Sequence, residues 1–492
     1  MKYISTRGGG QPVSSAQAIA MGIAEDGGLF VPESLPQLTQ EDLSSFGQMN
    51  YQGRAKSLMG RFLTDFSSEE IAHCVDAAYS TGKFASPQIA PVRLLEKNTG
   101  ILELFHGPTC AFKDMALQIL PHLMTLSVKK LEKDYTILIL VATSGDTGKA
   151  ALEGFRDVPG TEILVFYPTD GVSRVQKLQM MTQEGENVSV CGIYGNFDDA
   201  QTGVKRIFAD PSIRKKLEEK HKSFSSANSI NFGRLLPQVV YYFSAYADLQ
   251  QAGSIRQGDP INVVVPTGNF GNILAAYYAK RMGLPVQRLI CASNRNNVLT
   301  DFIRTGCYDR NRPFYPTSSP SMDILISSNL ERLLYHLSDA ETVSGLMQSL
   351  TQKGSYTLPL EMVQALQQDF YGGCCDEEET SNTIRSTFER SRYLLDPHTA
   401  VAVKVLEDYR QETGDSTMTV LASTASPYKF SDSVLPALCS GNKEEGFEAI
   451  SSLHAITGVP VPAPIAGLEG KALLHQQVCQ KEDMSQAVLS HL

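Results

Sequence analysis

The chain has 492 residues, 42% of them hydrophobic and 20% charged, which is typical of a folded protein with two or three domains. Its 43 basic and 53 acidic residues give a formal net charge of −10 without a long basic run, so the composition argues against a nucleic-acid partner. No stretch reaches the ~18 consecutive apolar residues of a membrane-spanning helix, and the start, MKYISTRGGGQP, lacks the apolar segment of a secretion signal.

Six short apolar runs rich in β-branched residues are typical of buried strands. They lie at residues 135–143, 161–168, 188–194, 261–267, 288–293 and 417–424. Helical patterns lie between them at residues 148–155, 173–183, 198–209, 234–251 and 271–282. Alternating strands and helices predict parallel sheets, whose strands end at a common edge where α/β proteins bind ligands.

We expect three consecutive units along the chain. Residues 1–95 show helical patterns without a strand series and form an N-terminal subdomain, whereas residues 96–255 and 256–492 form two α/β domains. The polar, glycine-containing stretches 372–382 and 439–446 are predicted to be exposed loops.

Nine cysteines are scattered along the chain, and none has the spacing of paired zinc ligands. We therefore expect no metal site, and we expect reduced thiols in a cytoplasmic protein.

Two glycine-containing turns join a predicted strand to a predicted helix. In the first, residues 268–272 (GNFGN), several backbone N–H groups would point at one spot, as in a phosphate site. The second, residues 144–148 (SGDTG), repeats the arrangement, although its Gly148-Lys149 pair lacks the spacing of a nucleotide-binding P-loop. Two alternatives remain open: a tight turn that needs glycine at residues 268–272, and simple helix capping by Ser144, Asp146 or Thr147.

One lysine, Lys113, lies inside the mostly apolar stretch LELFHGPTCAFKDMALQ. Burial lowers the pKa of a lysine and favours the neutral amine, the form that condenses with an aldehyde as a Schiff base. Next to a phosphate cradle, such a lysine indicates pyridoxal phosphate. The alternative is a structural lysine that reaches solvent or pairs with its neighbour Asp114.

A series of motifs in consistent order, from Tyr3 to Phe430, resembles the threonine synthases. They are YISTRGG, EDGGLFVPESLP, LELFHGPTCAFKDMALQ, SGDTGKAA, YPTDGVSRVQKLQM, NSINFGRLLPQVVYY, PTGNFGNILAAYYAKRMGLP, SPSMDILISSNLERLL, LDPHTAVA and STASPYKF. The resemblance implies the tryptophan-synthase-β-like (type II) fold of pyridoxal-phosphate enzymes, with two α/β domains and an N-terminal extension. It also implies the reaction, in which O-phosphohomoserine and water give threonine and phosphate by β,γ-replacement.

The same resemblance implies roles for individual residues. Lys113 would form the Schiff base and move protons, and Thr424 would contact the pyridine nitrogen. The cofactor phosphate would bind to Gly268, Asn269, Phe270, Gly271 and Asn272. The substrate would contact Ser144, Asp146, Thr147, Lys149, Asn228, Asn231 and Arg234. Residues 96–255 would thus carry the lysine and the substrate loop, and residues 256–492 the phosphate loop and the pyridine contact.

Some features leave alternatives open. Where many relatives have TAHPAKF this chain has TASPYKF, with Ser426 in place of histidine, and Cys110 replaces a more usual apolar residue. Related proteins resemble phospho-lyases that release 2-oxobutyrate, and a non-catalytic scaffold that binds the cofactor is a further alternative. His106 and His398 lie in the motifs and are expected to stabilise turns. With a small-molecule substrate as its partner, the protein would be a monomer or a homodimer.

Overall fold

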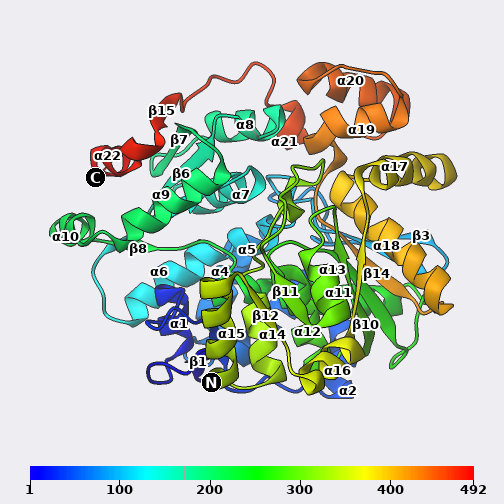
Figure 1. Ribbon diagram of the computed structural model, residues 1–492, viewed down its shortest axis with the longest axis horizontal. Coiled ribbons are helices and arrows are strands. Elements are labelled where there is room, and N and C mark those ends of the chain that lie inside the picture. Colours follow the sequence, from blue (N-terminus) through cyan, green and yellow to red (C-terminus); the bar gives the residue numbers. More distant parts are fainter. Residues whose placement is uncertain (171, 492) are drawn as a thin grey trace.

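The computed structural model describes residues 1–170 and 172–491, and two mainly parallel sheets organise them (Figure 1). The first sheet has the order β13 (Phe370–Cys374), β10 (Val286–Ser293), β9 (Ile261–Pro266), β14 (Thr419–Ser423), β4 (Thr99–Glu103) and β3 (Val92–Glu96). The second has the order β15 (Gln477–Gln480), β7 (Val188–Tyr194), β6 (Thr161–Pro168), β5 (Thr136–Ala142) and β8 (Lys222–Ser225). Among the described strands of these two sheets, only β3, on the edge of the six-stranded sheet, runs antiparallel to its neighbour.

The predicted strands and helices are confirmed to within two residues at nearly every end. The six predicted strands are β5, β6, β7, β9, β10 and β14, all largely buried, as continuous apolar runs indicate. The predicted helices are α7 (Asp146–Phe155), α8 (Arg174–Met181), α9 (Phe197–Ala209), α11 (Phe232–Gln251) and α12 (Gly271–Arg281). In the five-stranded sheet α7 packs against β6 and α9 against β5 and β6, and in the other sheet α12 packs against β9 and β10.

The strand pairing crosses the segment boundaries expected from the sequence. Strand β4 lies between β14 and β3, so the chain enters the six-stranded sheet before it forms the five-stranded one. The late strand β15 returns to the five-stranded sheet and pairs with β7. Because such pairing joins residues that lie hundreds of positions apart, local patterns do not reveal it. The stretch that carries Lys113 therefore leaves the six-stranded sheet and not the five-stranded one.

The N-terminal part contains short strands as well as the expected helices. Strands β1 (Tyr3–Ser5) and β2 (Phe30–Pro32) form an antiparallel pair. The helices here are α1 (Ser15–Met21), α2 (Gln40–Phe46), α3 (Tyr51–Phe62) and α4 (Ser68–Ala78). Helices α2 and α3 pack against α11, whose 20 residues are buried nearly throughout, while α1 packs against α6 (Leu120–Lys130). The N-terminal part is thus built onto the core.

The remaining helices surround the two sheets. They are α5 (Asp114–Leu117), α10 (Pro211–Glu219), α13 (Val298–Thr305), α14 (Leu330–Leu337), α15 (Ala340–Lys353), α16 (Leu360–Asp369), α17 (Glu377–Ser391), α18 (Pro397–Thr413), α19 (Ser431–Leu438), α20 (Gly446–Thr457), α21 (Ala463–Ala466) and α22 (Met484–His491). Strands β11 (Cys307–Asp309) and β12 (Ser355–Thr357) form a separate antiparallel pair.

Of the two stretches predicted as exposed loops, the first prediction is wrong. Residues 372–382 end the buried edge strand β13 and begin α17, with Cys375 buried. The acidic residues that indicated a loop cap this helix: the Asp376 side chain accepts a hydrogen bond from the N–H of Glu379 (2.8 Å). Residues 439–445 do connect α19 to α20 without regular structure.

Candidate active site

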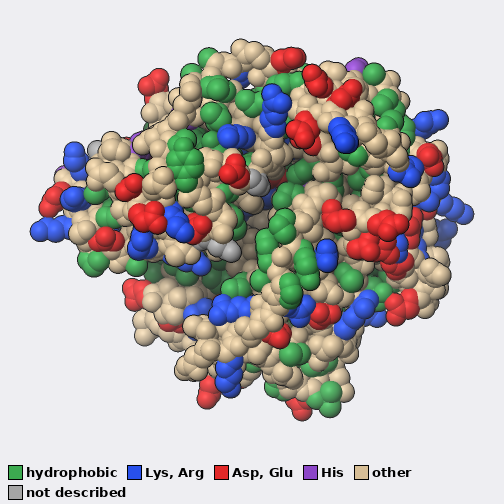
Figure 2. Space-filling view, turned by 45° about the horizontal axis from the view of Figure 1, so that its top comes forward, with side chains coloured by type: hydrophobic (Ala, Val, Ile, Leu, Met, Phe, Trp, Pro, Cys, Tyr) green, Lys and Arg blue, Asp and Glu red, His purple; other side chains and the backbone are tan. Residues whose placement is uncertain are grey.

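Turns at the ends of strands from both sheets surround a cavity of about 880 Å³. Its wall includes residues 142–144 after β5, residues 266–272 after β9, and Thr424 after β14. Residues 222–226 and 320–324 line it as well. Figure 2 shows the molecular surface hollowed near the middle of one face, with apolar and basic side chains around the hollow. The cavity thus lies between the two sheets' edges at which these strands end, the usual place for a ligand in an α/β protein.

Lys113 lies in the wall of this cavity, directly before α5. Its side chain is buried, and Nζ donates a hydrogen bond to Oγ of Ser321 (3.1 Å) and lies 3.7 Å from Oδ2 of Asp146. Burial lowers the pKa of Lys113 to about 8, although the Asp146 carboxylate opposes the shift. The neighbouring Asp114 does not pair with Lys113, because it accepts hydrogen bonds from the N–H and hydroxyl of Thr109 instead (2.8 and 2.6 Å).

The glycine turn at residues 268–272 faces the same cavity. In the described part of the chain, none of its backbone N–H groups donates to a backbone carbonyl. Gly268 has no room for a side chain, since a Cβ atom there would lie 2.4 Å from the carbonyl oxygen of Ser321. Phe270 has a φ of +63° and caps α12 without a side-chain hydrogen bond. The buried Nδ2 of Asn272 also has no partner among the described residues, so this turn offers unused donors.

One segment, residues 327–329, binds the carbonyls of this turn. The Ser327 hydroxyl donates to the Gly268 carbonyl (2.7 Å), and both the N–H and the Nδ2 of Asn329 donate to the Asn269 carbonyl (3.1 Å each). Because a peptide N–H points opposite to its carbonyl, these bonds direct the N–H groups of Asn269 and Phe270 away from the segment that binds the carbonyls.

Arg332 in turn holds Asn329. Its fully buried guanidinium donates to Oδ1 of Asn329 (2.5 Å) and to the carbonyls of Phe30 (3.0 Å) and Ile230 (2.6 Å). One side chain therefore joins the N-terminal strand β2, the segment before α11 and, through Asn329, the glycine turn.

The second turn, residues 144–148, lies at the N-terminus of α7. Thr143 performs the capping there, and not Ser144, Asp146 or Thr147, because its hydroxyl oxygen accepts from the N–H groups of Gly145 (3.0 Å) and Gly148 (2.9 Å). Ser144 and Thr147 are thereby left to line the cavity. Asp146 is buried and does not lie in the cavity wall.

Two polar residues near the start of α11 line another part of the wall, Asn228 and Arg234. Arg234 is buried, and its Nη1 donates to the carbonyl of Ala227 (2.8 Å). Burial lowers the pKa of Arg234 to about 10, so the guanidinium stays charged at neutral pH. A buried cation at a cavity wall is suited to a phosphate ligand.

Two of the substrate-binding candidates have other partners and do not line the cavity. Nζ of Lys149 lies 3.2 Å from Glu153 and also bonds Gln183. Asn231 caps α11, accepting from the N–H of Gly233 (2.9 Å), and donates to the carbonyl of Ile19 (3.0 Å). Both contacts serve the local fold.

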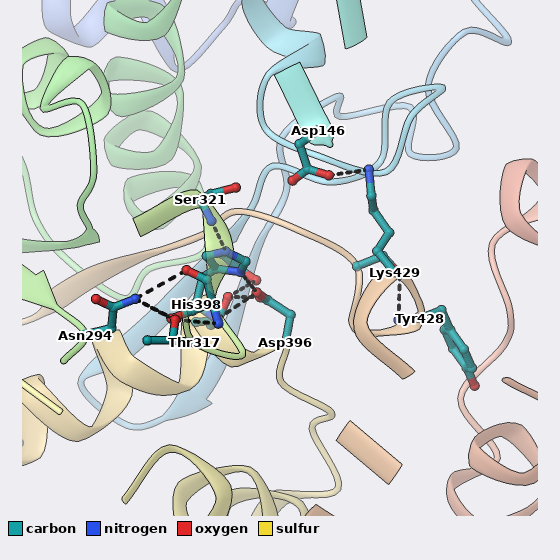
Figure 3. A network of polar contacts seen from close by, with 12 residues as sticks. Asp146, Asn294, Thr317, Ser321, Asp396, His398, Tyr428 and Lys429 are labelled. Carbon is teal, nitrogen blue, oxygen red and sulfur yellow. Dashed lines mark hydrogen bonds and ion pairs between the residues drawn. The ribbon is translucent and has the colours of Figure 1, made fainter. Parts of the chain in front are cut away.

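Thr424 and His398 lie on the side of the six-stranded sheet. The Thr424 carbonyl accepts from the N–H of Phe112 (2.8 Å), which ties β14 to the residue before Lys113. His398 pairs through Nδ1 with Asp396 (2.8 Å), and its Nε2 accepts from the N–H of Ser321 (3.2 Å), as Figure 3 shows. His398 thus positions the Ser321 segment that contacts Lys113. His106 pairs with Glu103 (2.7 Å) and does not line the cavity.

Comparisons with known proteins agree with this architecture. The family "Threonine synthase N terminus" matches residues 2–79, "Pyridoxal-phosphate dependent enzyme" matches residues 93–424, and "Threonine synthase, C-terminal" matches residues 399–484. Threonine synthase from Pseudomonas aeruginosa is 39% identical over 88% of this chain and 90% of its own length. The chain belongs to the threonine synthase family of pyridoxal-phosphate-dependent enzymes.

Two further comparisons qualify this relationship. The structure of pyridoxal-phosphate-bound threonine synthase from Brucella melitensis superposes with a TM-score of 0.88, at 37% identity over 100% of this chain and 99% of that chain. Human threonine synthase-like 1 is 45% identical over 86% of this chain, but only 58% of its length is covered. The chain spans about three fifths of the length of the first curated relatives it matches.

The residues of this chain fit pyridoxal phosphate, the cofactor of the family. A phosphate needs several convergent donors, which the glycine turn and Nδ2 of Asn272 offer. An aldehyde needs a neutral amine, which the lowered pKa of Lys113 favours. Both groups face one cavity.

Sequence reasoning missed Lys429, Ser321 and Arg332 as members of this site. Lys429 is buried and lies 2.8 Å from Asp146, a residue at the start of another helix. The motifs STASPYKF and SPSMDILISSNLERLL contain all three residues, so the resemblance marked their positions without indicating what they contact.

Proposed function

We propose that this protein is a threonine synthase, which converts O-phosphohomoserine and water to threonine and phosphate. The observation that carries the proposal is that one cavity presents two separate groups for phosphates. The glycine turn with Lys113 serves the cofactor, and the buried Arg234 with Asn228 serves the phosphate of the substrate. An enzyme that holds a phosphorylated cofactor and expels a second phosphate needs two such groups.

The cofactor side of the proposal assigns three elements. Bound pyridoxal phosphate supplies an electron-withdrawing ring that makes the protons at Cα and Cβ of an attached amino acid more acidic. Lys113 binds its aldehyde carbon, and the amides of residues 268–272 bind its phosphate. Thr424 contacts the pyridine nitrogen, where a hydroxyl holds a ring proton less firmly than a carboxylate does.

The substrate side assigns the second turn and α11. Ser144 and Thr147 orient the substrate carboxylate, and Asp146 shapes the turn that carries them. Asn228 and Arg234 bind the γ-phosphate and hold it after it leaves. With the cofactor bound, the amine of Lys113 would take the proton from Cα of the substrate. Lys149 and Asn231 support the fold around these residues and do not touch substrate.

We also propose that the protein works in the cytoplasm as a monomer or a homodimer. All nine cysteines are free, which supports a reducing compartment. None of the helices in the described residues is long and apolar enough to cross a membrane.

The test is a product assay with purified, pyridoxal-phosphate-loaded protein and O-phosphohomoserine. Threonine and phosphate in equal amounts support the proposal, and Lys113→Ala abolishes both while the thermal unfolding temperature shows that the variant is folded. 2-Oxobutyrate with ammonia and phosphate would instead identify a phospho-lyase. A protein that binds the cofactor but forms no product would refute both activities and leave a non-catalytic scaffold.

A further inference from the structure

A buried carboxylate lies between Lys113, which lines the cavity, and Lys429, which does not. Oδ1 of Asp146 is 2.8 Å from Nζ of Lys429 and also accepts from Nε2 of Gln176 (2.7 Å). Oδ2 faces Nζ of Lys113 at 3.7 Å. Figure 3 shows the Lys429 side chain extending from its own segment toward Asp146. The three charged groups come from segments that lie far apart in the sequence.

The two lysines are held unequally. Lys429 is almost completely buried, and its Nζ also donates to the carbonyl of Thr109 (2.7 Å), so two close oxygens hold its ammonium group in place. Lys113 has one hydrogen bond, to the hydroxyl of Ser321 (3.1 Å), and a longer contact with the carboxylate. Lys113 has the weaker contacts, so the loss of its proton sacrifices less stabilising interaction than the loss of the Lys429 proton would.

The local charge balance favours the same outcome. With both lysines charged, this buried group carries a net charge of +1, and loss of the Lys113 proton leaves a neutral Asp146–Lys429 pair. Besides Asp146 and Lys429, the charged group that acts on Lys113 is Arg234 on α11, which repels its ammonium. His398 on α18 contacts the same segment as Lys113, because it binds the N–H of Ser321.

We propose that Lys429 is a positioning residue that holds Asp146 in an ion pair and so leaves Lys113 free to become the neutral amine. Lys429 touches no reacting atom and acts through Asp146. Without Lys429, the carboxylate has Lys113 as its remaining ammonium partner and stabilises the charged form of that lysine. This proposal deepens the proposed function, because it rests on Lys113 as the lysine that binds the cofactor.

The experiment follows capture of pyridoxal phosphate by cofactor-free protein as a function of pH. In this reaction the Lys113 nitrogen replaces the aldehyde oxygen, which leaves as water, and the absorbance of the cofactor changes. The neutral amine is the reactive form, so the midpoint of the rate profile reports the protonation of Lys113. Ionisations of free pyridoxal phosphate are the same for every variant, and differences between variants come from the protein.

We expect Lys429→Met to raise the midpoint by at least one pH unit, which slows capture about tenfold at pH 7. Lys429→Arg keeps the charge and stays within half a unit of the unmodified protein. Asp146→Asn lowers the midpoint. As a matched control, Lys130→Met removes a lysine–carboxylate pair outside the cavity, with Glu70 (2.7 Å), and leaves the midpoint unchanged.

The double variant Lys429→Met/Asp146→Asn separates action through Asp146 from a direct effect and also serves if Lys429→Met folds poorly. A midpoint equal to that of Asp146→Asn supports the proposal, whereas a midpoint higher by a unit or more overturns it. An unchanged midpoint in folded Lys429→Met also overturns it and leaves a purely structural lysine. Because cofactor capture needs no substrate, these results are independent of whether the loaded protein forms threonine.

Discussion

Gly268 is the position where one added methyl group tests the cofactor turn. A Cβ atom there would lie 2.4 Å from the carbonyl oxygen of Ser321, whereas real Cβ contacts stay above 3.0 Å, so the substitution Gly268→Ala forces a shift of at least 0.6 Å. The turn resists the shift, because its carbonyls are bound by Ser327 and Asn329. The Ser321 segment resists as well, because His398 binds its N–H and Lys113 binds its hydroxyl.

Whichever side yields, the distance between the phosphate donors and Lys113 changes. Overpacking of a tight site costs about 1–3 kcal/mol, which corresponds to a loss of roughly fivefold to 150-fold in affinity. We therefore expect Gly268→Ala to bind pyridoxal phosphate at least about fivefold more weakly than the unmodified protein, measured by equilibrium titration of cofactor-free protein. Pyridoxal, which lacks the phosphate, should lose less affinity.

Gly271→Ala is the matched control in the same turn. Its Cβ would meet its nearest neighbour, Nδ2 of Asn329, at 3.5 Å, an ordinary contact distance. We expect its affinity for pyridoxal phosphate to stay within about threefold of the unmodified value. Equal affinities of Gly268→Ala and the unmodified protein, or an equal loss in both variants, would refute the assignment of this turn.

Three further predictions concern other parts of the molecule. Arg234→Met should raise KM for O-phosphohomoserine about 10- to 100-fold, as expected for a lost hydrogen bond to a charged group. Its affinity for pyridoxal phosphate, measured by the same titration, should not change. Arg234→Lys should alter the ratio of threonine to 2-oxobutyrate. Arg332→Met leaves three buried hydrogen-bond acceptors without their donor and should lower the free energy of unfolding in urea by about 3 kcal/mol or more. Burial lowers the pKa of His336 to about 4, so the unfolded state binds its proton first and stability falls as pH drops from about 6.5 toward 4. His336→Gln should remove about 2 kcal/mol of that loss at pH 5, and an unchanged pH dependence of urea unfolding would contradict this assignment.

The strands and helices could be predicted because their signals are local. The strand at residues 161–168 is a continuous apolar run, and glycines mark the turns that lead into helices, as Gly145 does before α7 and Gly268 does before α12. The place of β4 beside β14 could not be predicted, because paired residues such as Thr99 and Thr419 lie 320 positions apart and local patterns do not link them. Acidic residues misled the interpretation at Asp376, where they cap a helix.

The residues of the site also divide into those that a local pattern reveals and those that only long-range contacts bring together. Lys113 and the glycine turn stand out because an isolated lysine in an apolar stretch and a strand–glycine–helix order are unusual over a few residues. The ion pair of Asp146 with Lys429 joins residues 283 positions apart, and no spacing rule links them. The same holds for Arg332, whose partners Phe30 and Ile230 lie in two distant segments.

These long-range contacts explain why the site depends on the whole molecule. Lys113, the glycine turn and Thr424 follow strands of the six-stranded sheet, whereas Ser144 and Thr147 follow β5 of the other sheet. A substrate bound between them must contact both sheets, so the relative position of the sheets sets the geometry of the reaction. Asp146 and Lys429 join the two sheets beside Lys113, and Arg332 joins the glycine turn, through Asn329, to the N-terminal part. Changes in the N-terminal strand β2 can therefore alter cofactor binding through Arg332 without touching the cavity.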